Sequence, residues 1–143
     1  MLISFNTQDC NFKLKKKSLI REWIKLIAEK EKRSLGNINY IFCSEGELLK
    51  INIQYLNHHT LTDIITFDYT ENNTIAGDIF INPDRIIENA QKYNVTFEEE
   101  LRRVIIHGIL HLCGYKDKKS EEEKLMRKKE DKALKELLAL ENS

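Results

Sequence analysis

The stretch TFEEELRRVIIHGILHLCG (residues 96–114) predicts a helix that is buried in the folded protein. Thr96 and Glu99 have the spacing of a capping box, in which two side chains satisfy free backbone N–H groups at the start of a helix. Gly114 is placed to end the helix, because glycine readily adopts the left-handed conformation found after many helix C-termini. Residues 97–112 are apolar on most faces beyond the first two turns, which is typical of a helix surrounded by other elements.

The segments around this helix predict a sheet and several further helices. Alternating, β-branched and aromatic residues favour strands at residues 2–6, 38–42, 64–69 and 75–81. Capping patterns and an N-terminal proline predict helix starts at Ser18, at Ser44 with Glu47, at Pro83, and at Ser120 with Glu123. Gly36 is expected to break the chain after the first helix. The resulting order, β-α-β-α-β-β-α-α-α, predicts an α+β fold with a central sheet of about four strands packed by helices.

Length and composition indicate one globular domain. The 143 residues suffice for a single domain, 1–143, and no linker or repeat divides them. No apolar run approaches the roughly 18 residues of a membrane span, and the N-terminus lacks the pattern of a signal peptide. Three cysteines at wide spacings are not a disulfide framework. We therefore expect a cytoplasmic protein without a membrane partner, and the sequence leaves its oligomeric state open.

The net charge excludes a strong global attraction to nucleic acid. Equal numbers of acidic and basic side chains give a formal charge of zero, so an RNA partner would need a local positive patch. Candidate patches are KLKKK at residues 13–17 and the lysines and arginines between residues 116 and 132. Both tracts are also compatible with ordinary solvated surfaces, especially the second, in which acids alternate with bases.

Two histidines on the buried helix suggest a metal site. His107 and His111 are four residues apart, so they project from the same face of the helix, one turn apart. A single histidine in such a place is usually a hydrogen-bonded core residue. Two imidazoles in one apolar environment must both find partners for their ring nitrogens, and a shared cation satisfies that requirement.

Asp117 is the third candidate ligand. It follows His111 by six residues, after Gly114 allows the chain to turn back. Two histidines and one carboxylate leave a fourth position for water, which is the pattern of a catalytic zinc site rather than a closed structural one. The alternative is a solvated loop carboxylate. Cys113 points about 200° away from His111 around the helix and is interpreted as a small core residue.

A zinc protease is one alternative function. In His-Glu-x-x-His proteases the glutamate after the first histidine is the general base. That position is Gly108 in this chain, and glycine has no side chain to accept a proton. Met126, which could suggest the methionine turn of some proteases, is interpreted as ordinary packing.

Four segments resemble the YbeY family of bacterial metal-dependent endoribonucleases. HGILHLCGYKD (107–117) is similar to the family signature His-Gly-x-Leu-His-Leu-x-Gly-Tyr-Asp-His. TDIITF (62–67), GDIFI (77–81) and INIQYL (51–56) resemble its Thr-Asp-Val-Leu-Ser-Phe, Gly-Asp-Ile and Leu-Asn-x-x-Tyr-Arg elements, in the same order. The resemblance implies cleavage of single-stranded RNA in rRNA maturation, including the 16S 3′ end, and in ribosome quality control. It also implies rRNA precursors and ribosomal or small-subunit components as partners.

The resemblance implies one zinc ion, or another divalent metal, per chain, with His107, His111 and Asp117 as ligands. The family has histidine at the third position, where an ungapped count gives Asp117. If Lys116 is instead an insertion, the third ligand is missing. The family's arginine corresponds to Leu56, and the nearby His58 and His59 could supply a cation for phosphate or be exposed loop residues.

The expected reaction is phosphodiester hydrolysis by metal-activated water, with no further catalytic side chain assigned. Thr62, Asp63 and Thr66 are candidate substrate-binding residues. Asp78 is a candidate acceptor for the second nitrogen of a ligand imidazole, or a carboxylate that caps backbone. The main alternative function is a non-catalytic ribosome-assembly factor whose metal only stabilises the fold.

Overall fold

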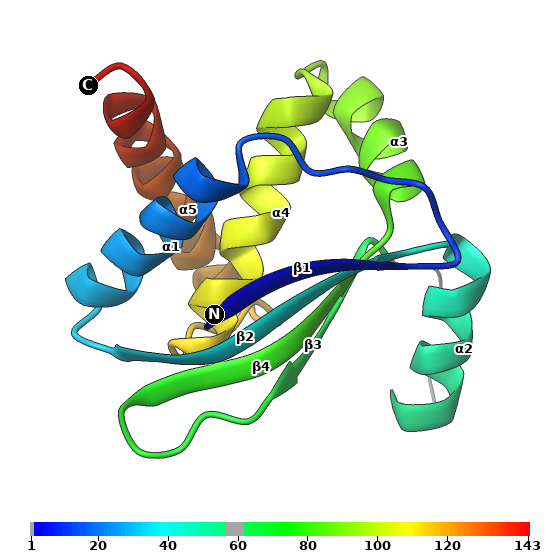
Figure 1. Cartoon of the computed structure of the whole chain (residues 1–143), viewed down its shortest axis with the longest axis horizontal. Helices are drawn as coiled ribbons and strands as arrows, with labels where there is room; N and C mark the ends of the chain where they lie inside the picture. Colours follow the sequence, from blue (N-terminus) through cyan, green and yellow to red (C-terminus); the bar gives the residue numbers. More distant parts are fainter. Residues whose placement is uncertain (1, 57–61) are drawn as a thin grey trace.

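The secondary-structure elements occur in the predicted order in the computed structural model, which describes residues 2–56 and 62–143 (Figure 1). The strands are β1 (Ile3–Gln8), β2 (Ser34–Cys43), β3 (Ile64–Asp68) and β4 (Thr74–Ile81). The helices are α1 (Lys17–Lys30), α2 (Glu45–Leu56), α3 (Pro83–Tyr93), α4 (Phe97–Leu112) and α5 (Ser120–Glu141). The predicted α+β class with a four-stranded sheet is therefore confirmed.

The sheet has the strand order β1-β2-β4-β3. β1, β2 and β4 are parallel, and β3 pairs with β4 in the antiparallel direction. The β3–β4 pair places Thr66 opposite Ile79, and Ile64 opposite Ile81. Because side chains alternate across a strand, these residues share one face of the sheet, while Ile65 and Phe80 belong to the other.

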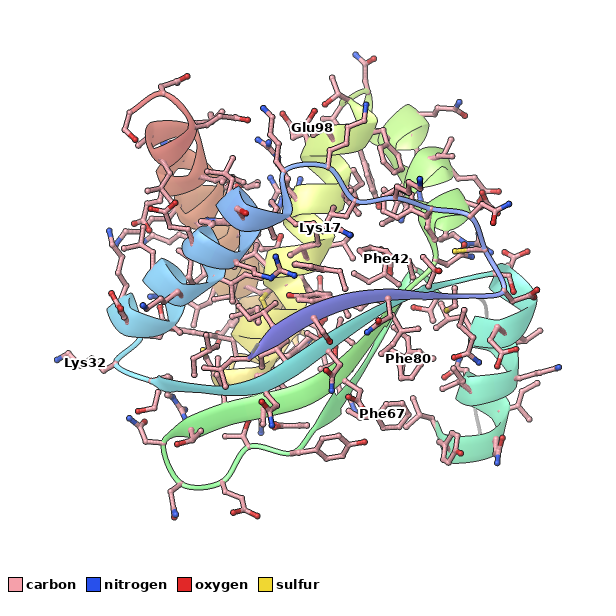
Figure 2. The ribbon with its side chains drawn as sticks, viewed as in Figure 1. Lys17, Lys32, Phe42, Phe67, Phe80 and Glu98 are labelled. Atoms are coloured by element: carbon pink, nitrogen blue, oxygen red, sulfur yellow. The ribbon has the colours of Figure 1, made fainter. Side chains whose placement is uncertain are left out.

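Helices cover the two faces unequally. α1, α3, α4 and α5 lie on one face, whereas α2 lies on the other, beside β3 (Figure 1). Figure 2 shows Phe42 on the side of the helix layer and Phe67 and Phe80 on the side of α2. A small second core, formed by Cys43, Leu48, Ile51 and Ile65, holds α2 against the sheet. α4 lies between the sheet and the outer helices.

The position of α4 explains its apolar sequence. Leu101, Ile105, Ile109 and Leu112 are each at most 5% exposed, and burying each such side chain contributes about 1.5–3 kcal/mol. A Cβ atom at Gly108 would lie only 3.0 Å from Cδ1 of Ile79, so glycine lets the helix approach the sheet closely. The prediction of a buried helix over residues 97–112 is confirmed.

Helix ends were predicted with mixed success. Thr96 accepts a hydrogen bond from the Glu99 N–H at 3.1 Å, and Ser44 does the same for Glu47 at 3.2 Å, as predicted. Pro83 is the first residue of α3, also as predicted, whereas the predicted starts of α1 and α5 were wrong by one or two residues. α1 begins after Lys16, which has a φ of 57°, and Ser18 makes no cap. Ser120 is the first residue of α5, and the capping interaction joins the Lys119 N–H to Glu122.

Gly36 does not break the chain as expected, because it lies inside β2 at a register shift against β4. There a Cβ atom would lie 2.8 Å from the carbonyl oxygen of Ile75, so only glycine allows the two strands to approach this closely. Within residues 2–56 and 62–143, no helix has the length and apolar character needed to cross a membrane.

Candidate metal centre and cleft

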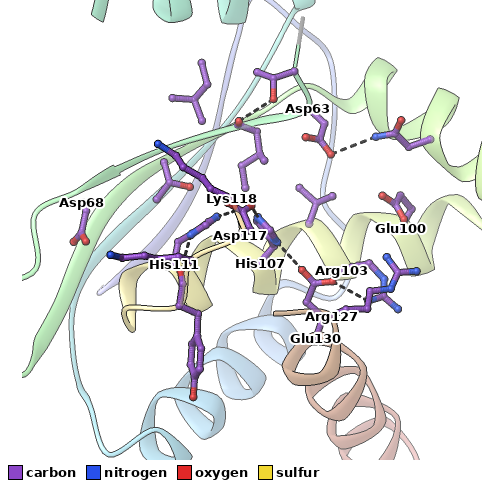
Figure 3. A pocket seen from close by; sticks show the side chains of 18 of the residues that line it. Asp63, Asp68, Glu100, Arg103, His107, His111, Asp117, Lys118, Arg127 and Glu130 are labelled. Atoms are coloured by element: carbon purple, nitrogen blue, oxygen red, sulfur yellow. Dashed lines mark hydrogen bonds and ion pairs between the residues drawn. The ribbon is translucent and has the colours of Figure 1, made fainter. Parts of the chain in front are cut away.

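His107 and His111 project from α4 toward Asp117, which lies in the loop after the helix (Figure 3). The Nε2 atom of His107 lies 3.1 Å from Oδ2 of Asp117, and the Nε2 atom of His111 lies 3.2 Å from the same oxygen. The two rings stand nearly perpendicular, with centroids 4.5 Å apart. In the described part of the chain, these three residues form the one group of histidine, cysteine or carboxylate side chains that could hold a metal ion.

The end of α4 brings the loop back to His111. Gly114 has a φ of +103°, and its N–H donates to the carbonyl of His111 at 2.9 Å. The Tyr115 N–H donates to the carbonyl of Leu110 at 3.1 Å, which completes a Schellman motif. The chain reversal places the Tyr115 carbonyl 2.9 Å from Nδ1 of His111. A carbonyl can only accept, so Nδ1 of His111 carries a proton and Nε2 faces Asp117.

Glu130, on α5, holds the other imidazole. Its Oε2 atom lies 2.5 Å from Nδ1 of His107, and its Oε1 atom accepts a hydrogen bond from Arg103 at 2.8 Å. Glu130 is only 4% exposed, and Arg103 also binds Asp131 at 2.7 Å. Burial lowers the pKa of His107, but the hydrogen bond and charge of Glu130, together with the charges of Asp117 and Asp63, outweigh burial and raise it.

The acceptor oxygens around the imidazoles are compatible with a bound cation. Each ring has an acceptor oxygen at Nδ1 and the carboxylate of Asp117 at Nε2. A neutral imidazole has one N–H and one lone pair, so it cannot satisfy acceptors on both sides. A proton on each ring or one shared cation at Nε2 resolves the conflict. Two imidazole nitrogens and one carboxylate oxygen are suitable zinc ligands and leave a coordination position open.

The three residues lie in a cleft of about 940 Å³. Its cationic lining residues are Arg103, Lys116, Lys118 and Arg127. Arg103 is engaged by Glu130 and Asp131, whereas no ion pair is found for Lys116, Lys118 or Arg127 within the described residues. None of the lysines at 13–17 lines this cleft. The cations without an ion pair therefore come from the loop after α4 and from α5. The cleft is also lined by five carboxyl groups, those of Asp63, Asp68, Glu100, Asp117 and Glu130.

Most predicted substrate-binding residues lie in the same cleft. Thr62, Asp63 and Thr66 line it, as does Leu56. His58 and His59 lie outside the described residues. Asp78 was predicted to contact a ligand imidazole and does not. It lies on the sheet face opposite α4, where it accepts hydrogen bonds from Asn39 at 3.0 Å and from Tyr69 at 3.3 Å. Sequence alternation did not reveal which face of β4 would meet α4.

Two further acids that line the cleft, Asp63 and Glu100, have raised pKa values. Burial raises the pKa of Asp63, although its backbone hydrogen bond, His107, Arg85 and Asn89 oppose the shift. Burial also raises the pKa of Glu100, which is only 7% exposed, and the charge of Asp63 adds to the increase. Both carboxyl groups therefore retain a proton to higher pH than an exposed acid.

Glu130 is the main site residue that the sequence interpretation missed. It belongs to a tract in which acids and bases alternate, so it resembled a surface residue. The available signal was its spacing, because Met126, Glu130, Ala133 and Leu137 form the buried stripe of α5. A glutamate in such a stripe requires a partner, and here the partners are His107 and Arg103. Met126 is 2% exposed, in agreement with its predicted packing role.

Two other predictions are consistent with the geometry. Cys113 is buried, and burial raises the pKa of its thiol to about 11, so it is a core residue as expected. Gly108 lies against Ile79 and Ile64 of the sheet rather than toward the cleft. A general base at this position would have to enter the apolar core, which argues against a protease of the His-Glu-x-x-His type.

Comparison with known proteins identifies the family. The model of the family Endoribonuclease YbeY matches residues 2–138. An endoribonuclease YbeY of Flavobacterium johnsoniae is 50% identical over 133 residues, which cover 93% of this chain and 95% of the relative. One from Flavobacterium psychrophilum is 52% identical over 134 residues, covering 94% and 95%. A Thermotoga maritima protein solved in solution matches with a TM-score of 0.66 and 34% identity, covering 96% of this chain and 89% of that protein. These matches agree with the motifs in the cleft, and the chain belongs to the YbeY endoribonuclease family.

Proposed function

We propose that this chain is a metal-dependent endoribonuclease that cleaves single-stranded RNA during rRNA maturation. Residues 1–143 act as one domain, with rRNA precursors and ribosomal components as partners in the cytoplasm. Processing at the 16S 3′ end and ribosome quality control are the proposed roles. Family membership supports RNA cleavage, and the convergence of His107, His111 and Asp117 within one cleft supports a metal at that point.

Zinc is the proposed ion, with the Nε2 atoms of the two histidines and a carboxylate oxygen of Asp117 as its ligands. When bound, such an ion lowers the pKa of water and polarises a phosphoryl oxygen. The protein's own contribution is orientation. Glu130 holds Nδ1 of His107, and the Tyr115 carbonyl holds Nδ1 of His111, so both Nε2 atoms remain directed toward Asp117.

The cations of the cleft would bind the RNA backbone. Lys116, Lys118 and Arg127 lie beside the metal-binding residues, and their charges attract phosphates despite the zero net charge of the whole chain. Thr62 and Thr66 line the same cleft and provide hydroxyl groups for polar contacts. Binding is expected to weaken as salt rises, because each phosphate contact releases counterions.

A non-catalytic assembly factor with a structural metal is the competing interpretation. The apolar contacts of α4 argue against it, because Leu101, Ile105 and Ile109 are buried in the core and can hold this helix in place without an ion. The deciding experiment combines metal analysis, thermal unfolding and cleavage of single-stranded RNA, before and after chelation. We expect chelation to abolish cleavage, a small change in unfolding temperature, and recovery when zinc is restored. If the untreated protein cleaves no RNA, and chelation of its metal causes it to unfold, the metal is structural.

A further inference from the structure

One wall of the cleft differs chemically from the rest. The lining residues contributed by α3 and by the segment before β3 are Thr62, Asp63, Asn89 and Tyr93, and they include no cation. The basic lining residues all come from α4, α5 and the loop between them. A phosphate is therefore attracted to the basic elements and is not favoured beside the carboxyl groups of Asp63 and Glu100.

This wall, which has no basic lining residue, combines an aromatic ring with hydrogen-bonding groups. Asn89 and Tyr93 are four residues apart on α3, so they lie one turn apart on the same side of the helix. Tyr93 is 51% exposed and lines the cleft, and the Nζ atom of the neighbouring Lys92 lies over its ring at 5.5 Å from the centroid. A base that stacks on Tyr93 would therefore use the opposite face of the ring. The Nδ2 atom of Asn89 donates a hydrogen bond to Oδ2 of Asp63 at 3.3 Å. An exposed ring thus adjoins an amide and a carboxyl group.

This combination matches a nucleobase better than it matches a sugar or a phosphate. A base presents a flat π-face that stacks on an aromatic side chain, and its edge carries donors and acceptors. We propose that Tyr93 stacks on a nucleobase of the RNA strand, whose edge faces Asn89 and Asp63. The proposal rests on the function proposed above, because it places the base in the cleft that contains His107 and His111.

The subsite also gives a physical reason for single-strand preference. A base within a duplex has both faces covered by its neighbours and its pairing edge occupied. It would have to leave the stack before it could reach Tyr93, at a cost of a few kcal/mol. A single strand already exposes its bases. The α3 wall would therefore select unpaired RNA, while the basic elements bind the backbone of any strand.

The proposal can be tested with short single-stranded 2′-O-methyl oligonucleotides that contain 2-aminopurine. Gels would verify that the protein does not cleave these oligonucleotides during the measurement. Stacking quenches the fluorescence of this base. We expect wild-type protein to quench it, and Tyr93→Ala to weaken binding about 5- to 150-fold, the value of one stacked base. Tyr93→Phe should bind almost as wild type. Tyr69→Ala is the matched control, because Tyr69 is 57% exposed but does not line the cleft.

An oligonucleotide of the same length with abasic sites separates stacking from backbone binding. Wild type and Tyr93→Ala should bind this oligonucleotide equally weakly, because it has no base that could stack on Tyr93. Equal binding of the base-containing strand by wild type and Tyr93→Ala would overturn the subsite and leave the nuclease function intact. A Tyr93→Ala defect of the same size on both strands would overturn it too. Failure of wild type to bind either strand would instead contradict the proposed RNA function.

Discussion

The carboxylate of Glu130 lies 2.5 Å from Nδ1 of His107 and simultaneously accepts a hydrogen bond from Arg103 at 2.8 Å. One buried side chain of α5 thus fixes an imidazole of α4. Removing such a partner from a metal-binding histidine typically weakens metal binding about 10- to 100-fold. We expect Glu130→Gln to lose zinc affinity on this scale, measured by competition with a chromogenic chelator.

Asp131→Asn is the control for this substitution. Asp131 binds the same Arg103 at 2.7 Å, but its side chain is 54% exposed and does not touch the histidine. Its loss should leave zinc affinity near the wild-type value. Equal affinities for Glu130→Gln and wild type would show that the carboxylate does not position His107.

His111→Ala should abolish RNA cleavage and preserve the fold. The variant removes one candidate ligand at the surface of α4, whereas Ile105 and Ile109 remain fully buried beneath it. We expect an unchanged circular dichroism spectrum, an unfolding temperature within a few degrees of wild type, and less bound metal. Lys128→Ala, on an exposed part of α5, controls for nonspecific effects. Undiminished cleavage by His111→Ala, with its metal confirmed as lost, would refute the metal-dependent mechanism.

Leu56→Arg should strengthen RNA binding. Leu56 is 41% exposed and lines the cleft, so an added guanidinium can reach a phosphate without burying its charge. We expect a lower KM for single-stranded RNA, an effect that shrinks at high salt, and a stability change within about 0.5 kcal/mol. Ile53→Arg adds the same charge to α2 at a residue that is 38% exposed and does not line the cleft. An identical KM change in both variants would point to nonspecific attraction.

Glu141 should contribute an acid-dependent part of the stability. Hydrogen bonds from Arg102, and then from Lys16, lower the pKa of its carboxyl group from 4.5 to about 2. A carboxyl group with a lowered pKa stabilises the folded state above its ordinary pKa, and the contribution is lost as the pH falls toward the folded-state value. The unfolding temperature of wild type should therefore fall more steeply between about pH 4.5 and 2 than that of Glu141→Gln. Parallel curves for the two proteins would contradict this role.

Local sequence signals predicted the elements better than their contacts. Thr96 and Gly114 mark the ends of α4 because capping depends on neighbouring backbone atoms. The i, i+4 spacing correctly predicted that His107 and His111 share one face of α4, because this relation also depends only on local helix geometry. Lys16, the residue before α1, has a left-handed conformation that no capping pattern indicated. Glu130 and Asp78 show the same limit, since their roles depend on which faces of distant elements meet.

The two histidines and Asp117 of the candidate centre belong to different kinds of structural element. Both histidines belong to a helix wedged against the sheet, whereas the aspartate belongs to the short connection between α4 and α5. Exchanging histidine for aspartate in that connection alters one donor atom and one unit of charge, yet it disturbs none of the buried contacts of α4. A substitution at position 117 is therefore expected to change which ion is preferred, while the packing of the helix that carries the other two donors stays the same.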